Sequence, residues 1–332
     1  MQKDTNWGTQ RPTEKSCRIT PFYYHTTPVV CLPDYNLESY AGIKNDAQFP
    51  MRSGKQVKDD IDVFFSFNNG RELHLASKKV KLMKGQRVYT RIDNLFPGIT
   101  PNYPYLIGVH KVPTIYSGTK EKMLQERSLT ETELNWWGTE TTQFHDFYYQ
   151  GGGKGAVLYT IPPFVNDERI RKSGDILFFS PNGFISPTVT SLVLAINWST
   201  NHAYKTTVSF MYEICDASGK TLTTEEVRIA PFGLAVVDIK KVLERRLGSR
   251  FESFLKGGKS VFCRGISVGG SLILTMMNID HALKVVTIEH STIPQHFCST
   301  IPSNKPGTYI VKKNATEFFK KKFEKAQRKE KA

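Results

Sequence analysis

The sequence predicts a mainly β protein, an all-β fold of two tandem antiparallel β-sandwich or jelly-roll domains. Short runs rich in β-branched and aromatic residues fill most of the chain, and Gly, Pro, Asn or Ser clusters separate them. Regular helices do not alternate with these runs, which argues against a parallel α/β sheet. At 332 residues, the chain is also longer than one hydrophobic core usually supports.

Twelve runs are predicted to be strands: DVFFSF, KKVKLM, RVYTRI, AVLYTI, DILFFS, SLVLAINW, TTVSFMYEI, EEVRIA, LAVVDI, SVFCRGISV, SLILTMMNI and LKVVTIEH. We expect an N-terminal sandwich over residues 1–155, a C-terminal sandwich over 156–305 and a basic tail over 306–332. Residues 64–96 and 208–243 follow a similar order of strands and Gly-containing turns. This similarity is explained either by an internal duplication or by hairpins that arose independently in the two segments.

Two stretches interrupt the β pattern. From Ile239 to Gly258, apolar residues recur at helical spacing and a Gly pair ends the segment. This pattern predicts an amphipathic helix over residues 239–256, packed across one end of a sheet. Residues 119–137 are expected to form one or two short helices.

The expected join between the domains is the Gly-rich loop QGGGKGAV, residues 150–157, or the IPPF turn just after it. The GGGKG segment of the loop superficially matches a phosphate-binding loop. Such a loop requires Ser or Thr after the Lys and a helix after that, whereas here Gly and a β-rich run follow. A flexible connector is therefore the better interpretation.

The net charge of +14 is unevenly distributed. Residues 312–332 hold nine Lys or Arg and three Glu, a net +6, which leaves +8 (14 minus 6) for the other 311 residues. No apolar run is long enough to span a bilayer, and the polar N-terminal residues do not resemble a signal peptide. Five scattered cysteines without a CxxC pair favour free thiols, so we expect a cytoplasmic protein without a transmembrane segment.

Aromatic residues concentrate in turn-rich segments of the first half, including NYPYLIGVHKVPTIYS, LNWWGTE and QFHDFYYQ. Core packing explains most of them. Binding residues nevertheless favour loops, and adjacent aromatic residues cannot all face inward from one strand. A stacking platform for sugars or bases is therefore expected at Trp136, Trp137, His145, Tyr148 and Tyr149.

The segment TIEHSTIPQHF brings together Glu289, His290 and His296, which are ligand types for a divalent transition metal. In a regular strand Glu289 and His290 point to opposite faces, so a shared site requires a bulge. His281 is expected in the turn at the far end of the hairpin. No cofactor is expected, although this cluster leaves a metal open, and no nucleophile motif such as G-x-S-x-G is present.

The tail ATEFFKKKFEKAQRKEKA, written as a helix, places Phe319 and Phe323 on one face with Phe318 beside them. Its positive charges predict binding to a polyanion or an anionic membrane surface; they are Lys320, Lys321, Lys322, Lys325, Arg328 and Lys329. A solvated, frayed terminus is the alternative.

Three functions follow from these patterns. The first is a non-catalytic interaction protein that binds a glycan or a protein surface through the aromatic segments, an expectation based on fold analogy. The second is a metal-dependent enzyme acting on a sugar-like substrate through residues 289–296. The third is a structural shell or nucleic-acid-associated double jelly roll whose basic tail contacts a polyanion.

Overall fold

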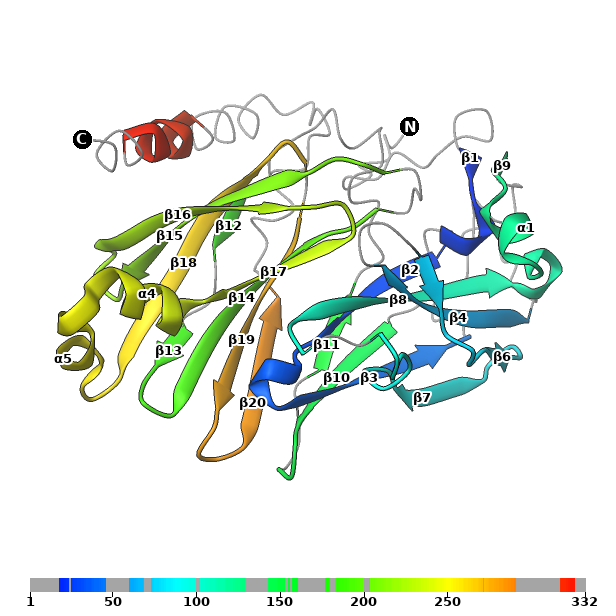
Figure 1. The fold of residues 1–332 in the computed structure, drawn as a ribbon, viewed down its shortest axis with the longest axis horizontal. Helices are drawn as coiled ribbons and strands as arrows, with labels where there is room; N and C mark the ends of the chain where they lie inside the picture. Colours follow the sequence, from blue (N-terminus) through cyan, green and yellow to red (C-terminus); the bar gives the residue numbers. More distant parts are fainter. Residues whose placement is uncertain are drawn as a thin grey trace, which may run out of the picture. The chain divides into compact units, whose positions relative to one another are not determined.

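A computed structural model gives the fold of the chain (Figure 1). The residues it describes are 18–23, 25–45, 60–68, 73–99, 102–128, 143–152, 155, 157–160, 177–179, 183–199, 204–270, 272–290 and 317–325. The protein is mainly β, and the pairings between described strands are antiparallel, as predicted. No helix within the described residues is long and apolar enough to cross a membrane.

The chain forms two compact units. The first comprises Met1–Phe147, Val157–Phe164 and Ser199–Tyr204, and the second comprises Tyr148–Ala156, Val165–Trp198 and Lys205–Ala332. The predicted join, residues 150–157, thus belongs mostly to the second unit.

Two sheets make up the first unit. One sheet has the order β2 (His25–Cys31), β8 (Tyr105–Pro113), β4 (Ile61–Asn68) and β5 (Leu73–Leu75), and β6 (Val80–Leu82) also pairs with β4. The other has the order β11 (Val157–Thr160), β10 (Gln143–Tyr149), β3 (Leu37–Lys44) and β7 (Arg87–Arg91). Buried residues from both sheets, among them Ala41, Ile43, Phe65 and Ile107, form one core, so the sheets pack face to face.

Short elements surround these sheets. They are β1 (Arg18–Ile19), which pairs with β9 (Arg127–Ser128), the 3₁₀ turns η1 (Pro21–Tyr23), η2 (Pro33–Tyr35) and η3 (Thr114–Tyr116), and the helix α1 (Lys120–Leu124). Strand β8 is buried along its whole length, because one face lies in the core and Phe22 of η1 stacks on His110 on the other.

The second unit repeats this plan with a separate core. One sheet has the order β12 (Leu177–Phe179), β18 (Lys259–Val268), β15 (Val208–Asp216) and β16 (Thr221–Ile229), with β13 (Gly183–Ile185) also on β18. The other has the order β17 (Gly233–Asp238), β14 (Val189–Asn197), β19 (Ile273–Asp280) and β20 (Val285–His290). Val193, Phe210, Cys263 and Leu274 are among the residues that fill the space between them.

The strand orders of the two units correspond along the chain. In the first unit β8 lies between β2 and β4, and β3 lies between β10 and β7. In the second, β18 lies between β12 and β15, and β14 lies between β19 and β17. The two similar segments, residues 64–96 and 208–243, therefore contain corresponding strands. Each begins in one sheet, with β4 or β15, and continues in the other sheet, with β7 or β17.

The twelve predicted strands are present, but the structure also contains strands outside those runs, among them β2 and β3, and the predicted helix is divided. Each of the twelve predicted runs coincides with a strand. However, strands β8 and β10 lie in segments that the sequence assigned to turn-rich regions, because Pro, Gly, His and Lys interrupt their apolar residues. The helix predicted over 239–256 is instead α4 (Ile239–Leu247) and α5 (Phe251–Leu255), joined by the 3₁₀ turn η4 (Gly248–Arg250).

Gly248 causes this break. Its φ of 54° lies in the left-handed region and ends α4. The side chain of Asp238 caps the first turn by accepting a hydrogen bond from the backbone N of Lys241 at 3.0 Å. The predicted apolar face is nevertheless in place, because Ile239, Leu243, Phe251 and Leu255 are buried in the core. In the region 119–137, the structure shows α1 and β9 among the described residues.

Candidate functional site

The outer face of the β3–β7 sheet carries a stacked pair of tyrosines. Along β3, residues alternate between buried and half-buried, so Tyr40 lies on the face opposite the core. Gly42 pairs with Tyr89 of β7, and Tyr40 lies diagonally from it. Because Gly42 has no side chain, the two tyrosine rings can stack, with centroids 5.2 Å apart and planes inclined by 10°. Tyr89 is 49% exposed.

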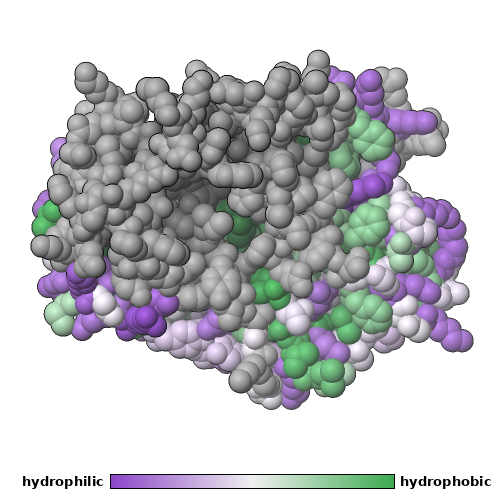
Figure 2. All heavy atoms as spheres, turned by 180° about the vertical axis from the view of Figure 1, so that it is seen from behind, coloured by the Kyte–Doolittle hydropathy of each residue, from purple (hydrophilic) through white to green (hydrophobic). Residues whose placement is uncertain are grey.

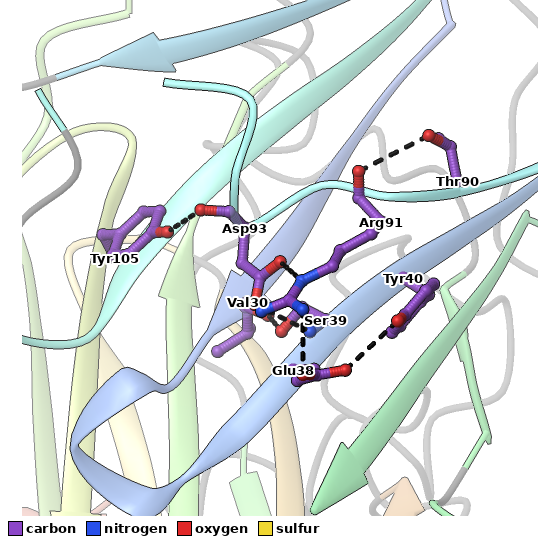
Figure 3. A network of polar contacts seen from close by, with 8 residues as sticks. All are labelled: Val30, Glu38, Ser39, Tyr40, Thr90, Arg91, Asp93 and Tyr105. Carbon is purple, nitrogen blue, oxygen red and sulfur yellow. Dashed lines mark hydrogen bonds and ion pairs between the residues drawn. The ribbon is translucent and has the colours of Figure 1, made fainter. Parts of the chain in front are cut away.

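Arg91 fixes the polar surroundings of this pair (Figure 3). Its Nη1 donates to Oε1 of Glu38 at 2.8 Å, and its Nε donates to Oδ1 of Asp93 at 2.7 Å. The hydroxyl of Tyr40 donates to Oε2 of Glu38 at 3.1 Å, and the hydroxyl of Tyr105 donates to the carbonyl of Asp93 at 3.0 Å. One guanidinium thus holds two carboxylates and, through Glu38, the Tyr40 ring in place.

Two groups of this network have raised pKa values, Arg91 and Tyr40. The hydrogen bond to Asp93 raises the pKa of Arg91, which stays protonated. Desolvation, followed by the hydrogen bond to Glu38, raises the pKa of Tyr40, which stays neutral. The face therefore presents two aromatic rings beside a guanidinium group and two carboxylates that are held in place by hydrogen bonds.

Strand β10, which is adjacent to β3, contains three of the residues predicted to form an aromatic platform: His145, Tyr148 and Tyr149. His145 is fully buried, and neither ring nitrogen has a hydrogen-bond partner among the described residues. Tyr149 is 9% exposed, and its hydroxyl lies 3.1 Å from Nδ1 of His281. His145 and Tyr149 share the inward face of β10 with Phe147, and ligand contact by these two residues stays a prediction. Tyr148 is half-buried on the other face, and Trp136 and Trp137 lie outside the described residues.

The tyrosine pair is not among the binding residues predicted from the sequence. The sequence does contain an indication of it, because polar and apolar residues alternate in LESYAGIK and RVYTRI and place a tyrosine on the polar face of each strand. Of these two segments, only RVYTRI is among the predicted strands. The sequence therefore does not predict that Tyr89 pairs with Gly42 or that the ring of Tyr89 stacks on Tyr40.

The metal ligands predicted in β20 are only partly within the described residues. Glu289 pairs with Met276 and His290 with Thr275 in unbroken register, so there is no bulge between the two positions. His281 lies in the turn at the opposite end of the hairpin, where its Nε2 is 3.2 Å from Oγ1 of Thr190. The described residues contain no group of three or more metal-ligand side chains. His296 lies outside them, and the metal site stays a prediction.

One Ser–His pair has the geometry of a nucleophile and its base. Oγ of Ser66 lies 2.6 Å from Nε2 of His110, and Nδ1 of His110 lies 2.9 Å from the carbonyl of Phe22. The carbonyl fixes Nδ1 as a donor, so Nε2 accepts from Ser66. Both residues are buried, at 0% and 2% exposure, beneath Phe22. A substrate cannot reach this pair, and its role is to satisfy polar groups on the covered face of β8.

The basic tail is partly docked. Residues 317–325 form a helix (red in Figure 1) whose Phe319 and Phe323 pack against Ile266. Lys322 donates to Glu213, and its contact with a polyanion stays a prediction. Lys320, Lys321 and Lys325 are exposed. Arg328 and Lys329 lie outside the described residues.

No protein family model matches this chain, and no curated protein matches it. Among solved structures, it is similar to a glycosyl hydrolase family 2 member from Bacteroides cellulosilyticus DSM 14838, with 11% identity and a TM-score of 0.19 over 80% of this chain and 27% of that one. A β-glucuronidase from glycoside hydrolase family 2 has 11% identity and a TM-score of 0.18, over 82% and 25%. Coconut cocosin has 10% identity and a TM-score of 0.13, over 75% and 78%.

The chain therefore spans about a quarter of the length of the two family 2 proteins that it matches. These are β-rich structures, and likenesses at this level carry no argument about function.

Hydrophobic and hydrophilic residues are interspersed over the described part of the rear surface (Figure 2). The large apolar side chains most exposed to solvent are Leu283, Tyr103, Ile115, Phe318, Met83 and Tyr89. Of these, Tyr89 is the one that combines exposure with a stacked partner and an ordered polar network.

Proposed function

We propose that this chain is a non-catalytic interaction protein that binds an extended ligand, with a glycan as the first class and a protein surface as the alternative. The observation that carries the proposal is the stacked Tyr40–Tyr89 pair on the outer face of the β3–β7 sheet. Aromatic rings pack against the C–H faces of sugars, and neighbouring carboxylates and guanidinium groups bond to hydroxyls.

Preorganisation supports the same conclusion. The ion pairs of Arg91 with Glu38 and Asp93 hold the face in one arrangement before a ligand arrives. Binding to such a face avoids part of the entropy cost of ordering side chains. A sheet face is also elongated, which suits a chain-like ligand better than a compact one.

Affinity measurements on a glycan panel test this proposal. Tyr89→Ala should lower the affinity of a bound glycan by about tenfold or more, the range of an aromatic hot spot. The matched control is Tyr103→Ala, because Tyr103 is 64% exposed and has no stacked partner among the residues that the structure describes. Circular dichroism confirms that both variants fold.

Equal affinities of Tyr89→Ala and the unchanged chain would exclude this face as the binding site. Capture of a protein that depends on Tyr89, with no glycan bound, would identify a protein surface as the ligand. Trp136→Ala with Trp137→Ala tests the contribution that the sequence assigns to those two residues.

Polyanion binding is a second candidate function. The packing of Phe319 and Phe323 against the sheet leaves Lys320, Lys321 and Lys325 at the surface, next to Phe318, which is 56% exposed. Exposed cations on an ordered helix attract nucleic acid with a strong dependence on salt.

A further inference from the structure

The helix formed by residues 317–325 lies against the outer face of β15 and β18. Phe319 and Phe323 pack against Ile266, with Met211 and Val268 at the edge of the same cluster. None of these five residues belongs to the cluster that fills the space between the two sheets of the second unit. The core between the two sheets therefore contains no residue of the helix. The helix packs on the outer face of one sheet only.

Two aromatic side chains anchor the helix. Phe319 and Phe323 are 4% and 3% exposed and lie one turn apart on the same helix face. Phe318, which points away from that face, is 56% exposed. The contrast shows that burial is specific to the docked face and is not a general property of the aromatic residues in this segment.

A buried carboxylate lies beside these anchors. Glu213 is fully buried and accepts hydrogen bonds from Lys322 of the helix, from Arg264 of β18 and, at 2.7 Å, from Oγ1 of Thr221. Lys322 also donates to Oγ1 of Thr221 at 3.0 Å. Burial alone would raise the pKa of Glu213, but these hydrogen bonds outweigh it and hold the pKa below its ordinary value. The face therefore selects a helix with a cation between two aromatic residues.

The docked helix is separable from the rest of the unit. The described part of the helix spans nine residues, and a segment of that length does not persist alone in water, so its contacts with the face stabilise it. Residues 291–316 connect it to β20, and a chain of 26 residues reaches up to roughly 90 Å. An empty face would expose Ile266, Met211 and Val268 around a buried charge, which is unfavourable in water.

We propose that this face, formed by Met211, Glu213, Arg264, Ile266 and Val268, binds the C-terminal helix of a second copy of this chain in exchange for its own. The exchanged helix makes the same contacts as the resident one, so exchange costs little in contact energy. The length of the connection allows the helix to reach a neighbouring copy. When two copies exchange their C-terminal helices, the contacts that join them are the same contacts that each helix makes within one copy.

Two full-length variants test the exchange by complementation. The tail variant carries Phe319→Ala and Phe323→Ala, which removes both anchors and leaves the face intact. The face variant carries Ile266→Glu, which lies outside the inner core and blocks docking. Each alone should lack exchanged dimers. Mixed together, they should form a 1:1 complex by size-exclusion chromatography with light scattering, and Glu213→Ala in the tail variant should weaken it by about tenfold or more.

Matched controls keep the result interpretable. A face variant that also carries the two Phe→Ala changes should form no complex. Val268→Glu replaces Ile266→Glu if the latter does not fold. As an independent measurement, the tail variant should bind a fluorescent peptide of residues 314–328. Absence of both the complex and peptide binding would overturn the site, and peptide binding without a complex would overturn exchange between copies.

Discussion

Two histidines are buried in the first unit in different ways. His110 stacks on Phe22 and is hydrogen-bonded at both ring nitrogens. His145 is equally buried, and neither ring nitrogen has a hydrogen-bond partner within the described part of the chain. Burial lowers the pKa of each to about 3, so both are neutral in the folded state across the physiological range.

These histidines predict a loss of stability in mild acid. In the unfolded chain they protonate as the pH falls below about 6.5, whereas the folded state binds no proton until about pH 3, so the unfolded state gains stability in between. Lowering the pH from 7 to 5 should cost about 2 kcal/mol for each histidine. Urea unfolding at the two pH values measures this difference.

His145→Leu provides the control for this pH dependence. The substitution removes one of the two fully buried histidines, so the acid-induced loss should fall by about 2 kcal/mol. Carboxylates with lowered pKa values, such as Glu213 and Glu225, lose their contribution only as the pH falls below their ordinary range, outside this window. An unchanged pH dependence would show that His145 is not buried as described.

The burial of an individual residue could be predicted from the sequence where the hydrophobic pattern around it allowed one interpretation. Cys215 and Cys263 lie in apolar runs and are buried free thiols, as expected. In QFHDFYY, both faces of the strand carry aromatic residues, so the pattern does not identify the inner face. Only the packing of Phe147 in the core shows that His145 points inward.

At the scale of elements, the pairing of β15 with β18 depends on a close backbone approach. Gly265 of β18 pairs with Tyr212 of β15. A Cβ atom on Gly265 would lie 2.4 Å from the carbonyl oxygen of Met211 and 2.9 Å from the ring of Phe210. The first of these atoms is backbone, so it cannot move away without disturbing the ladder between the strands.

Gly265→Ala should therefore destabilise the second unit by about 2 kcal/mol or more, through overpacking. The matched control is Gly98→Ala, because a Cβ atom there meets nothing within 4 Å and the residue needs no left-handed backbone. Urea denaturation of the two variants measures the contrast. Equal stabilities would mean that the strands separate more easily at Gly265 than the ladder indicates.

The C-terminal helix predicts opposite effects for neighbouring lysines. Lys321 and Lys325 are exposed, whereas Lys322 bonds to the buried Glu213. Lys321→Gln with Lys325→Gln should weaken binding to single-stranded DNA and reduce the slope of its salt dependence by about one to two, without lowering the melting temperature. Lys322→Gln should lower the stability of the docked helix by about 1 kcal/mol or more and leave the salt slope almost unchanged. Identical behaviour of the three lysines would indicate a fully solvated tail.

Elements were predicted best where hydrophobic residues are continuous. All twelve predicted runs are strands, because β-branched and aromatic residues recur in them between turn residues. Strand β8 was missed since His110 and Lys111 interrupt its apolar pattern, yet both are buried by tertiary contacts. The docking of the tail was not predictable either. The surface to which it docks, the outer face of β15 and β18, consists of residues that lie more than 50 positions before Phe319 in the sequence.

The whole molecule contains two sandwiches with corresponding strand orders and separate cores. The similarity between residues 64–96 and 208–243 is reproduced in the order and pairing of the strands, which the spacing of turns alone could not establish. The units differ in what covers the corresponding outer faces. In the first unit Phe22 of η1 lies on β8, and in the second unit the C-terminal helix lies on β18.

Separate cores predict separable unfolding. Phe65 is fully buried in the first core and Phe210 in the second, and replacing either by Ala should cost about 3–5 kcal/mol. Differential scanning calorimetry should resolve two transitions. Phe65→Ala should shift only one of them and Phe210→Ala only the other, and the double variant should show the sum of the two effects because the sites share no core contacts. A single transition that both substitutions lower equally would mean that the two cores unfold as one cooperative unit, and that the corresponding strand orders do not give them independent stability.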